Sequence, residues 1–295
     1  MFRVRRLLAP FVLCIALLFS EAQAFTIAWL SDTQNYHNAY KPIFDGMTQW
    51  IADNRAALDI RFVFHTGDVV GRWSSEDQWR QARESMGILS SASIPFLVAC
   101  GNHDIGYRMN YANFLKYVLS LRPASMSQEY GDTGSRYELF SANGRDYIFM
   151  GIAFSNKGPS EDEVNWINGV LRQYSSRDAI IITHSYLKKS ASYTTQGKAI
   201  FEKIVKANPN VFLVLCGHCR DISYKNVQLD DDGDGDPDRT VYAILSNFQG
   251  SKAGGGGYMR ILDFRDSDIY IYTYSPYYDS CEYPKGKTEA TVPLP

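Results

Sequence analysis

The sequence predicts an α/β fold in which helices flank two packed β-sheets. Between residues 25 and 215, short apolar runs alternate with segments of helical periodicity, which is typical of parallel strands joined by crossover helices. From residue 241 onward, runs at 241–249, 257–264 and 269–275 follow one another without helices and indicate consecutive antiparallel strands. We therefore expect these last strands to form a second sheet packed on the first. Neither an internal repeat nor a linker is evident, so residues 25–295 are predicted to form a single domain.

The first 24 residues have the pattern of a secretory signal peptide. Arginines at positions 3, 5 and 6 precede an apolar run at 7–19, and Ala22-Gln23-Ala24 provides a small-x-small cleavage site. The apolar run is too short to cross a bilayer, which takes about 20 residues. We expect cleavage after Ala24, export to the periplasm or the extracellular space, and no membrane span in the mature chain. An uncleaved anchor and a lipid-modified Cys14 are the alternatives.

The mature chain is predicted to begin with three strands and two crossover helices. Apolar runs at 25–30, 61–65 and 94–100 predict buried strands. Between them, apolar residues recur at helical spacing within 39–57, and a second helix at 75–89 begins with a capping-box pattern. His65 stands inside the second strand, so we interpret it as a core histidine rather than a ligand. The short links favour a parallel sheet with right-handed crossovers.

The middle of the chain is predicted to continue this alternation. Residues 107–134 are rich in Tyr, Asn, Ser and Met, and we interpret them as a helix and a loop that form part of a substrate wall. Two strands within 135–154 flank Ala142-Asn143-Gly144, which is a hairpin signal. A helix at 161–173, a strand at 179–182, a helix near 197–207 and a strand at 211–215 follow.

Polar side chains stand within three residues of the ends of five of the predicted strands. They are Asp32, Asp68, Asn102, His184 and His218. Because parallel strands bring such ends together along one edge of a sheet, we expect these carboxylates, amide and imidazoles to converge. Donors of these types suit one or two divalent metal ions.

The tetrapeptide Gly101-Asn102-His103-Asp104 combines three kinds of polar side chain. Asn102 offers a hard carbonyl oxygen as a ligand, and His103 can transfer a proton near neutral pH. Asp104 is expected to fix the tautomer of the His103 ring. A simple polar turn is the alternative interpretation of this segment.

Charge and cysteine content limit the function classes. Lys+Arg 30 against Asp+Glu 32 give a net charge of -2, so bulk charge does not predict nucleic-acid binding. The motif Cys216-Gly217-His218-Cys219 defines a redox alternative, because it spells the dithiol of thioredoxin-like oxidoreductases. There the motif begins a helix, whereas here it follows a strand and precedes extended chain at 220–224. The disulfide pairing stays open among Cys100, Cys216, Cys219 and Cys281.

An acidic segment at 230–238 matches the start of an EF-hand-like calcium loop. Asp230, Asp232, Asp234 and Gly235 occupy the expected positions, but Val241 stands where a bidentate glutamate is needed. Weak structural calcium binding and an acidic, solvated loop are the two interpretations.

The order of the polar blocks resembles that of the calcineurin-like metallophosphoesterases. The blocks are Asp32-Thr33-Gln34, Gly67-Asp68, Gly101-Asn102-His103-Asp104, Thr183-His184 and Gly217-His218, which span nearly the whole mature chain. The resemblance implies a four-layer, metallo-dependent phosphatase-like fold, in which helices flank a two-sheet β-sandwich. It also implies hydrolysis of phosphate mono- or diesters by a metal-bound hydroxide, with Mn, Fe, Zn or Mg as cofactors.

The resemblance further implies roles for individual residues. Asp68 would bridge two metals, and Asp32 would hold the first. The second site would be completed by Asn102, His184 and His218. His103 would protonate the leaving oxygen or stabilise the transition state, with Asp104 orienting it.

Two residues depart from the usual pattern of that family, and both belong to the first metal site. Gln34 and Arg220 stand where the family commonly has histidine. The Gln34 carbonyl can still ligate, whereas arginine stays protonated and cannot. We therefore expect an asymmetric centre with one or two ions per chain, whose oxygen-rich first site suits Mg, Mn or Ca. Arg220 is expected to clamp a phosphate oxygen, with a salt bridge to Asp32 or a loop acid as the alternative.

The rival function is a catalytically inactive protein that binds phosphorylated ligands on the same scaffold. The substrate, the choice between monoester and diester, and the oligomeric state stay open. We expect specificity to depend on loops 107–134 and 250–257. The second loop follows Asn247-Phe248-Gln249, and together with Tyr274-Ser275-Pro276 this part resembles the closing segment of secreted bacterial members of the family.

Overall fold

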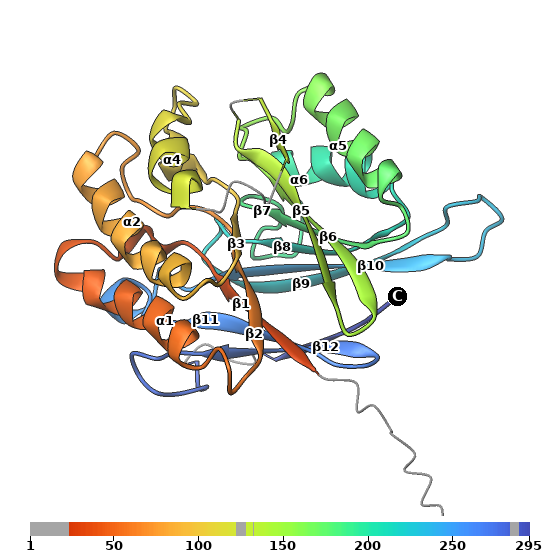
Figure 1. Cartoon of the computed structure of the whole chain (residues 1–295). Coiled ribbons are helices and arrows are strands. Elements are labelled where there is room, and N and C mark those ends of the chain that lie inside the picture. Colours follow the sequence, from red (N-terminus) through yellow and green to blue (C-terminus); the bar gives the residue numbers. More distant parts are fainter. Residues whose placement is uncertain (1–23, 122–127, 132, 284–288) are drawn as a thin grey trace, which may run out of the picture.

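Two mixed β-sheets pack face to face, and helices cover their outer faces (Figure 1). This computed structural model describes residues 24–121, 128–131, 133–283 and 289–295. The predicted signal peptide at 1–24 lies outside the described residues, except for Ala24. No helix within those ranges is long and apolar enough to cross a membrane. The predicted fold class, two sheets with flanking helices, is confirmed.

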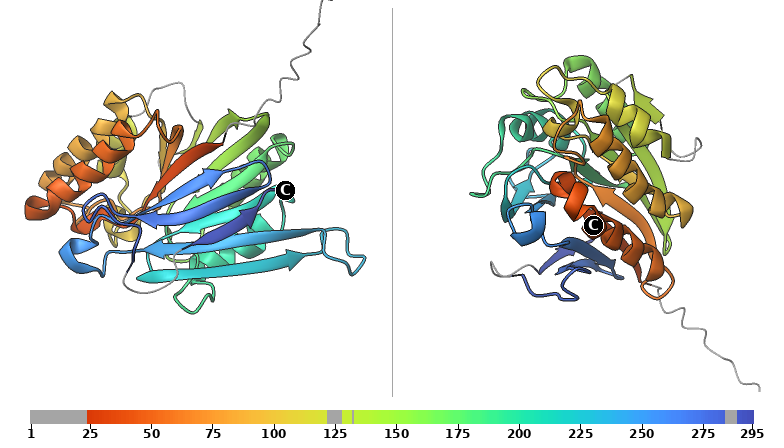
Figure 2. Two further views of the ribbon diagram at one scale, coloured as in Figure 1. Left: turned by 90° about the horizontal axis from the view of Figure 1, so that it is seen from below. Right: turned by 90° about the vertical axis from the view of Figure 1, so that its left-hand side faces the viewer.

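The six-stranded sheet has the order β13-β12-β11-β1-β2-β3. Its strands are β1 (Phe25–Leu30), β2 (Ile60–His65), β3 (Phe96–Val98), β11 (Met259–Phe264), β12 (Asp268–Tyr274) and β13 (Ala290–Pro293). β1, β2 and β3 run parallel, and β11 pairs antiparallel with the other edge of β1. The crossover helices α1 (Lys41–Asp53) and α2 (Glu76–Ser91) lie side by side on the outer face (Figure 2). Ile43, Met47 and Ile51, spaced four apart, bury the inner side of α1.

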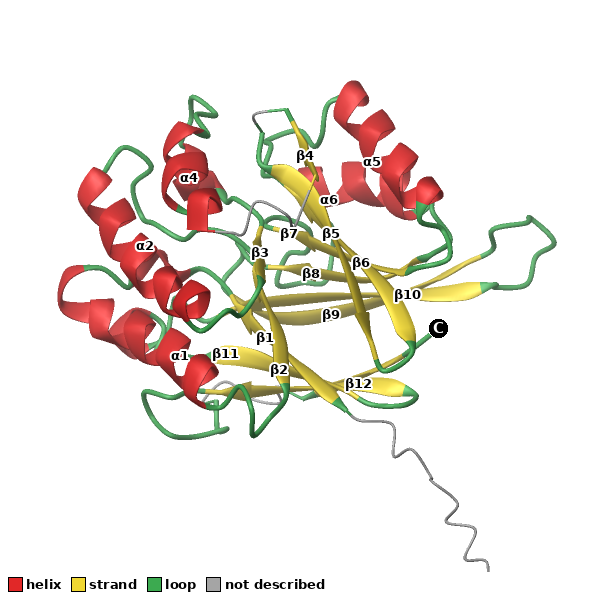
Figure 3. Ribbon diagram, in the orientation of Figure 1, coloured by secondary structure: helices red, strands yellow, loops and turns green. Residues whose placement is uncertain are grey.

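The seven-stranded sheet has the order β4-β5-β6-β7-β8-β10-β9. Its strands are β4 (Gln128–Tyr130), β5 (Ser135–Ala142), β6 (Arg145–Ile152), β7 (Asp178–Thr183), β8 (Val211–Cys216), β9 (Asp221–Leu229) and β10 (Arg239–Asn247). Helix α5 (Glu161–Gln173) and helix α6 (Thr195–Ile200), which continues as a π-helical turn at Phe201–Val205, cover its outer face (Figure 3). Asn143 and Gly144 both have positive φ and close the predicted hairpin between β5 and β6. Two short helices, α3 (Asn102–Ile105) and α4 (Ala112–Tyr117), follow β3.

Aromatic side chains fill the layer between the sheets. The ring centroids of Phe62 and Phe64 in β2 lie 4.9 and 4.8 Å from the ring centroid of Phe149 in β6, both in edge-on arrangements. Phe25 of β1 packs on Phe140 of β5 with 5.5 Å between ring centroids. Such ring pairs bury large apolar areas in defined geometries. The aromatic core therefore holds the two sheets, and the loops at their ends, in a fixed relation.

The predicted sheet of consecutive C-terminal strands is wrong. β10 does not pair with β11, because it lies between β8 and β9, parallel to the first and antiparallel to the second. β11 and β12 are antiparallel neighbours as expected, but they extend the first sheet through β1. β1 is buried along its whole length, because it has a neighbouring strand on each edge and a packed layer on each face. The sequence does not predict β4 or β13, and it predicts only the start of β9.

Candidate metal centre

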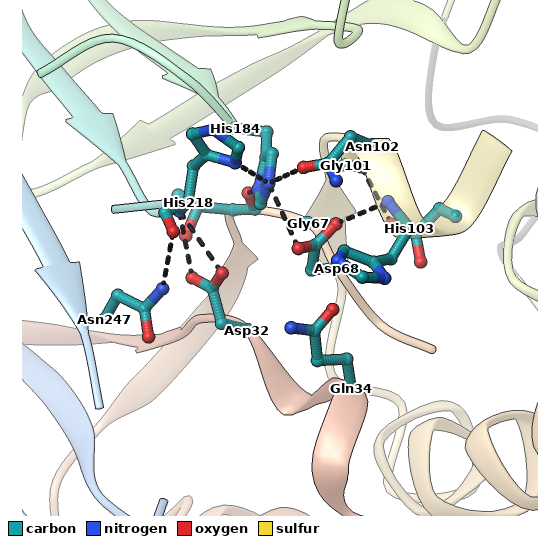
Figure 4. Close-up of polar contacts among 12 residues, drawn as sticks. Asp32, Gln34, Gly67, Asp68, Gly101, Asn102, His103, His184, His218 and Asn247 are labelled. Atoms are coloured by element: carbon teal, nitrogen blue, oxygen red, sulfur yellow. Dashed lines mark hydrogen bonds and ion pairs between the residues drawn. The ribbon is translucent and has the colours of Figure 1, made fainter. Parts of the chain in front are cut away.

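The ends of four long strands and of β3 meet at one edge of the sandwich, where they bring the predicted ligands together (Figure 4). The convergence spans both sheets rather than the single sheet that the sequence predicts. The six-stranded sheet contributes Asp32, Asp68 and Asn102, and the seven-stranded sheet contributes His184 and His218. The centre therefore depends on how the two sheets pack, and not on one sheet alone.

Three of these residues hold a strained backbone conformation. Asp32, Asp68 and His218 follow their strands with φ angles of 50°, 53° and 68°. Residues other than glycine adopt this left-handed conformation rarely, because Cβ is then too close to the backbone. Strain of this kind persists where the surroundings enforce it, and it gathers at functional sites. The turns are thus shaped to direct these side chains inward.

The His184 ring is the centre of one group of donors. Its Nδ1 donates to the carbonyl oxygen of Thr66 at 2.8 Å, so its Nε2 faces the site. That Nε2 lies 3.1 Å from Oδ1 of Asn102, 3.3 Å from Oδ2 of Asp68 and 3.1 Å from Nδ1 of His218. The ligand atoms of Asp68, His184 and His218 all lie within 4.8 Å of one another. Two imidazoles, a carboxylate and an amide oxygen form a donor set that fits a divalent transition metal ion.

The charges of this group also favour a cation. Burial alone would lower the pKa of His184, but the nearby Asp68 carboxylate raises it to about 9. Burial alone would raise the pKa of Asp68, but His184 holds it below its usual value. Burial, together with the charge of His184, lowers the pKa of His218 to about 4. Positive charge is therefore stabilised at Nε2 of His184, where a proton and a metal ion would compete.

A second group of donors, Asp32 and Gln34, comes from the turn after β1 and points toward the same space (Figure 4). The Asp32 carboxylate accepts from the backbone N of His218 at 3.2 Å and from the hydroxyl of Ser31. Burial raises the pKa of Asp32 to about 7. Nε2 of Gln34 donates to Oε1 of Gln249, whereas Oε1 of Gln34 is buried and has no hydrogen-bond partner among the described residues. This side of the centre presents only oxygen donors.

The predicted contact between Asp104 and the His103 ring is wrong. Nδ1 of His103 donates instead to the carbonyl oxygen of Gly71 at 2.9 Å, and Nε2 of this exposed ring has no hydrogen-bond partner among the described residues. The Asp104 carboxylate is buried and accepts three backbone hydrogen bonds of 2.8 to 3.0 Å. Its donors are Val69, Val70 and Gly101. Asp104 thus joins the loops after β2 and β3, and Gly71 orients the ring.

Two glycines are required because buried carboxylates pass directly over them. A Cβ atom at Gly101 would lie 2.2 Å from Oδ1 of Asp68, and one at Gly217 would lie 2.3 Å from Oδ2 of Asp32. No side chain fits at these distances. The only local sign of this requirement in the sequence is that a glycine directly precedes both Asn102 and His218.

Asn247 and Gln249 belong to the centre, although their positions in the sequence do not predict it. Nδ2 of Asn247 donates to the carbonyl oxygen of His218 at 3.1 Å, and its Oδ1 accepts from the backbone N of Gln249 at 2.9 Å. The Gln249 side chain then accepts from Gln34. The end of β10 is thereby tied to the turns after β1 and β8.

Arg220 is exposed, and it makes no hydrogen bond or ion pair within the described part of the chain. The alternative salt bridge to Asp32 or to a loop acid is therefore not found there. The stem of Arg220 lies beside Gly250, since its Cδ would be 3.5 Å from a Cβ atom at that position. Gly250 follows Gln249 directly, so the stem of Arg220 lies beside the segment that carries Gln249.

The thiols do not support the redox alternative. All four cysteines among the described residues are free, and Cys216 is buried at the end of β8. Burial raises the pKa of the Cys216 thiol to about 12, so it is not a thiolate at neutral pH. The motif leads into the turn from β8 to β9. As the sequence predicts, it does not begin a helix.

In the acidic loop between β9 and β10, the carboxylates that lie close together are not the three predicted to bind calcium. Ligand atoms of Asp230, Asp232 and Asp238 lie within 4.8 Å of one another, so Asp238 takes the place predicted for Asp234. The Asp234 carboxylate accepts from the backbone N of Asp236 instead. The loop is exposed and projects from the far end of β9 and β10 (Figure 1). Exposed acidic groups are common without an ion, so calcium binding stays a prediction.

Asp104→Asn is expected to lower the free energy of unfolding by about 1–3 kcal/mol. The amide has a single acceptor oxygen, so at least one of the three backbone donors would lose its buried partner. Urea unfolding measures the change. Asp266→Asn, at an exposed turn between β11 and β12, is the matched control and should change stability by less than about 0.5 kcal/mol. Equal effects of the two substitutions would contradict the positioning role of Asp104.

The chain is similar to known proteins in sequence. A family model described as calcineurin-like phosphoesterase matches residues 25–219. The uncharacterized protein YvnB of Bacillus subtilis (strain 168) is 41% identical over 259 residues, which cover 86% of this chain and 20% of YvnB. The chain thus spans one fifth of the length of that relative.

Two solved structures share the fold at low sequence identity. A dimetal phosphatase from Danio rerio is 12% identical, with a TM-score of 0.60 over 91% of this chain and 98% of that one. The purple acid phosphatase PPD1 from yellow lupin (Lupinus luteus) seeds is 12% identical, with a TM-score of 0.57 over 92% of this chain and 54% of that one. Likeness at this level of identity establishes a common fold.

Proposed function

The chain belongs to the calcineurin-like phosphoesterase family, and from this premise we propose that it is a metal-dependent hydrolase of phosphate mono- or diesters. The observation that supports the proposal most directly is the convergence of donors around Nε2 of His184, with the exposed His103 beside them. The backbone N of His103 donates to Oδ1 of Asp68 at 2.9 Å, so the ring and the metal ligands share one anchor.

A divalent ion such as Mn, Fe or Zn bound at this point would supply Lewis-acid activation of the ester and of water. The residues that would hold it are Asp68, Asn102, His184 and His218. The Thr66 carbonyl keeps the proton of His184 on Nδ1 and so directs the lone pair of Nε2 toward the site.

His103 is the proposed proton donor to the leaving oxygen. Because the Gly71 carbonyl accepts from Nδ1, the opposite atom, Nε2, is the one that would give its proton to a substrate. The ring is exposed, so a bound ester could reach it. This orientation favours catalysis over the rival function, because a protein that only binds phosphorylated ligands needs no oriented proton donor.

Arg220 is the proposed phosphate clamp. It follows His218 by two residues and has no partner of its own among the described residues. A guanidinium can donate two parallel hydrogen bonds to phosphate oxygens, which both binds and orients the group.

His103→Ala is expected to reduce kcat on an aryl phosphate ester about 10²–10⁴-fold, which is the usual loss for a general acid. Metal content should be unchanged, because the His103 side chain is not among the ligands. Steady-state kinetics and elemental analysis on the same preparation measure both quantities. His37→Ala is the control, since His37 contacts Asn38 and none of the proposed ligands. If wild type cleaves no ester with any of several divalent ions, the phospholigand-binding function is favoured instead.

Arg220→Ala is expected to lower kcat/KM about 10-fold or more, through loss of a charge-assisted hydrogen bond. Arg220→Lys should recover only part of the lost kcat/KM, because lysine keeps the positive charge but lacks the planar guanidinium that donates two parallel hydrogen bonds. Arg172→Ala removes an exposed arginine of α5 and controls for the loss of charge. An unchanged kcat/KM in Arg220→Ala would show that the guanidinium does not contact the substrate.

We also propose that the chain is exported, on the strength of the basic start, apolar run and small-x-small site in residues 1–24. Amino-terminal sequencing of the protein from its expressing host should give a chain that starts at Phe25. Retention of the arginine-rich start on intracellular protein would contradict export.

A further inference from the structure

The two sides of the metal centre differ in the donor atoms that they present (Figure 4). Around Nε2 of His184 lie a second imidazole nitrogen, an amide oxygen and a carboxylate oxygen. On the β1 side the donors are the Asp32 carboxylate and the Gln34 amide oxygen. Among the residues that the structure describes, no histidine joins this side. His65, the buried histidine of β2, is held by the Thr33 hydroxyl at 2.9 Å and lies in the core as predicted.

The Gln34 side chain is held in one orientation. Its Nε2 donates to Oε1 of Gln249, and the backbone N of Gln249 is in turn bound to Oδ1 of Asn247 at 2.9 Å. Oε1 of Gln34 is therefore the atom that faces the centre. Gln34 is only 7% exposed, and Oε1 has no partner among the described residues. A buried oxygen without a partner is unfavourable, and a hard cation would satisfy it.

Arg220 cannot add a ligand to this side. The guanidinium stays protonated and has no acceptor atom. Its stem lies at Gly250, next to Gln249, the residue that orients the Gln34 amide. The oxygen side therefore offers no nitrogen ligand, whereas the imidazole side would hold its ion with two of them.

We propose that the centre is divided: its His184 side retains one transition metal ion tightly, and its Gln34 side binds a hard cation such as Mg²⁺ weakly and reversibly. This proposal depends on the proposed function in one respect, because it assumes that a metal ion binds on the His184 side. Imidazole donors suit transition metals, and carboxylate and amide oxygens suit Mg²⁺. Gln249 is then a positioning residue, because it determines which atom of the Gln34 amide meets the cation.

Metal retention tests the division without an assay of activity. The chain is loaded with Zn²⁺, dialysed against metal-free buffer and analysed for zinc, and about one ion per chain should remain. Gln34→His places an imidazole on the oxygen side and should raise retention to about two ions. Gln173→His, on the exposed surface of α5, is the matched control and should retain as much zinc as wild type. Two retained ions in wild type, or no gain in folded Gln34→His, overturns the proposal.

A second measurement keeps the proposal testable if Gln34→His does not fold. Calorimetric titration of Mg²⁺ into the zinc-loaded wild type should reveal one weak site. Gln249→Leu should weaken that site about 10-fold or more and leave zinc retention unchanged. No Mg²⁺ binding in wild type, or unchanged binding in Gln249→Leu, overturns the proposal. Failure of the phosphoesterase function looks different, because ester cleavage would then be missing while the metal measurements come out as expected.

Discussion

The centre depends on the buried charge of Asp68. This side chain is 2% exposed, and its Oδ2 faces His184 of the other sheet, whereas its Oδ1 accepts from the backbone N of His103, which follows β3 of the same sheet. A buried carboxylate is costly unless donors and opposite charge surround it. The left-handed backbone of Asp68 and the lack of a Cβ at Gly101 bring those neighbours into contact with it. The strained turns are thus the means by which the fold keeps a negative charge where a cation can meet it.

The sequence predicts which polar side chains converge at the centre, because their signal is local. Each of Asp32, Asp68, Asn102, His184 and His218 stands within four residues of the end of an apolar strand, and strand ends gather at one edge of an α/β fold. The types of the side chains then indicate the chemistry. The prediction that His65 is a core residue is confirmed for the same reason. A histidine inside an apolar strand is buried with that strand, and here the Thr33 hydroxyl is its hydrogen-bond partner.

The remaining features depend on contacts between distant parts of the chain. Nothing in the run 241–249 tells that β10 inserts between β8 and β9, yet this insertion carries Asn247 and Gln249 to the centre. The Asp104 error has a different cause, because adjacency to His103 suggests a contact that the backbone forbids. Asp104 is the third residue of the short helix α3, and its carboxylate turns back to the backbone N of Gly101. That is the geometry of a helix cap, and capping rules applied to this tetrapeptide would predict it.

An oxygen-only site gains most from a ligand that brings further oxygens. Mg²⁺ keeps near-octahedral geometry and is commonly bound by one or two carboxylates together with phosphate groups of a substrate. Asp32 and the oriented oxygen of Gln34 supply fewer donors than that geometry requires, so phosphate oxygens would complete the set. Burial raises the pKa of Asp32 to about 7, which means that a cation near it also competes with a proton. In its proposed role as phosphate clamp, Arg220 would add a positive charge that favours the phosphate more than a second free cation. On this view, the hard cation and the phosphate ester stabilise each other in the site, and the residues that weaken metal binding on the β1 side are the ones that couple it to the substrate.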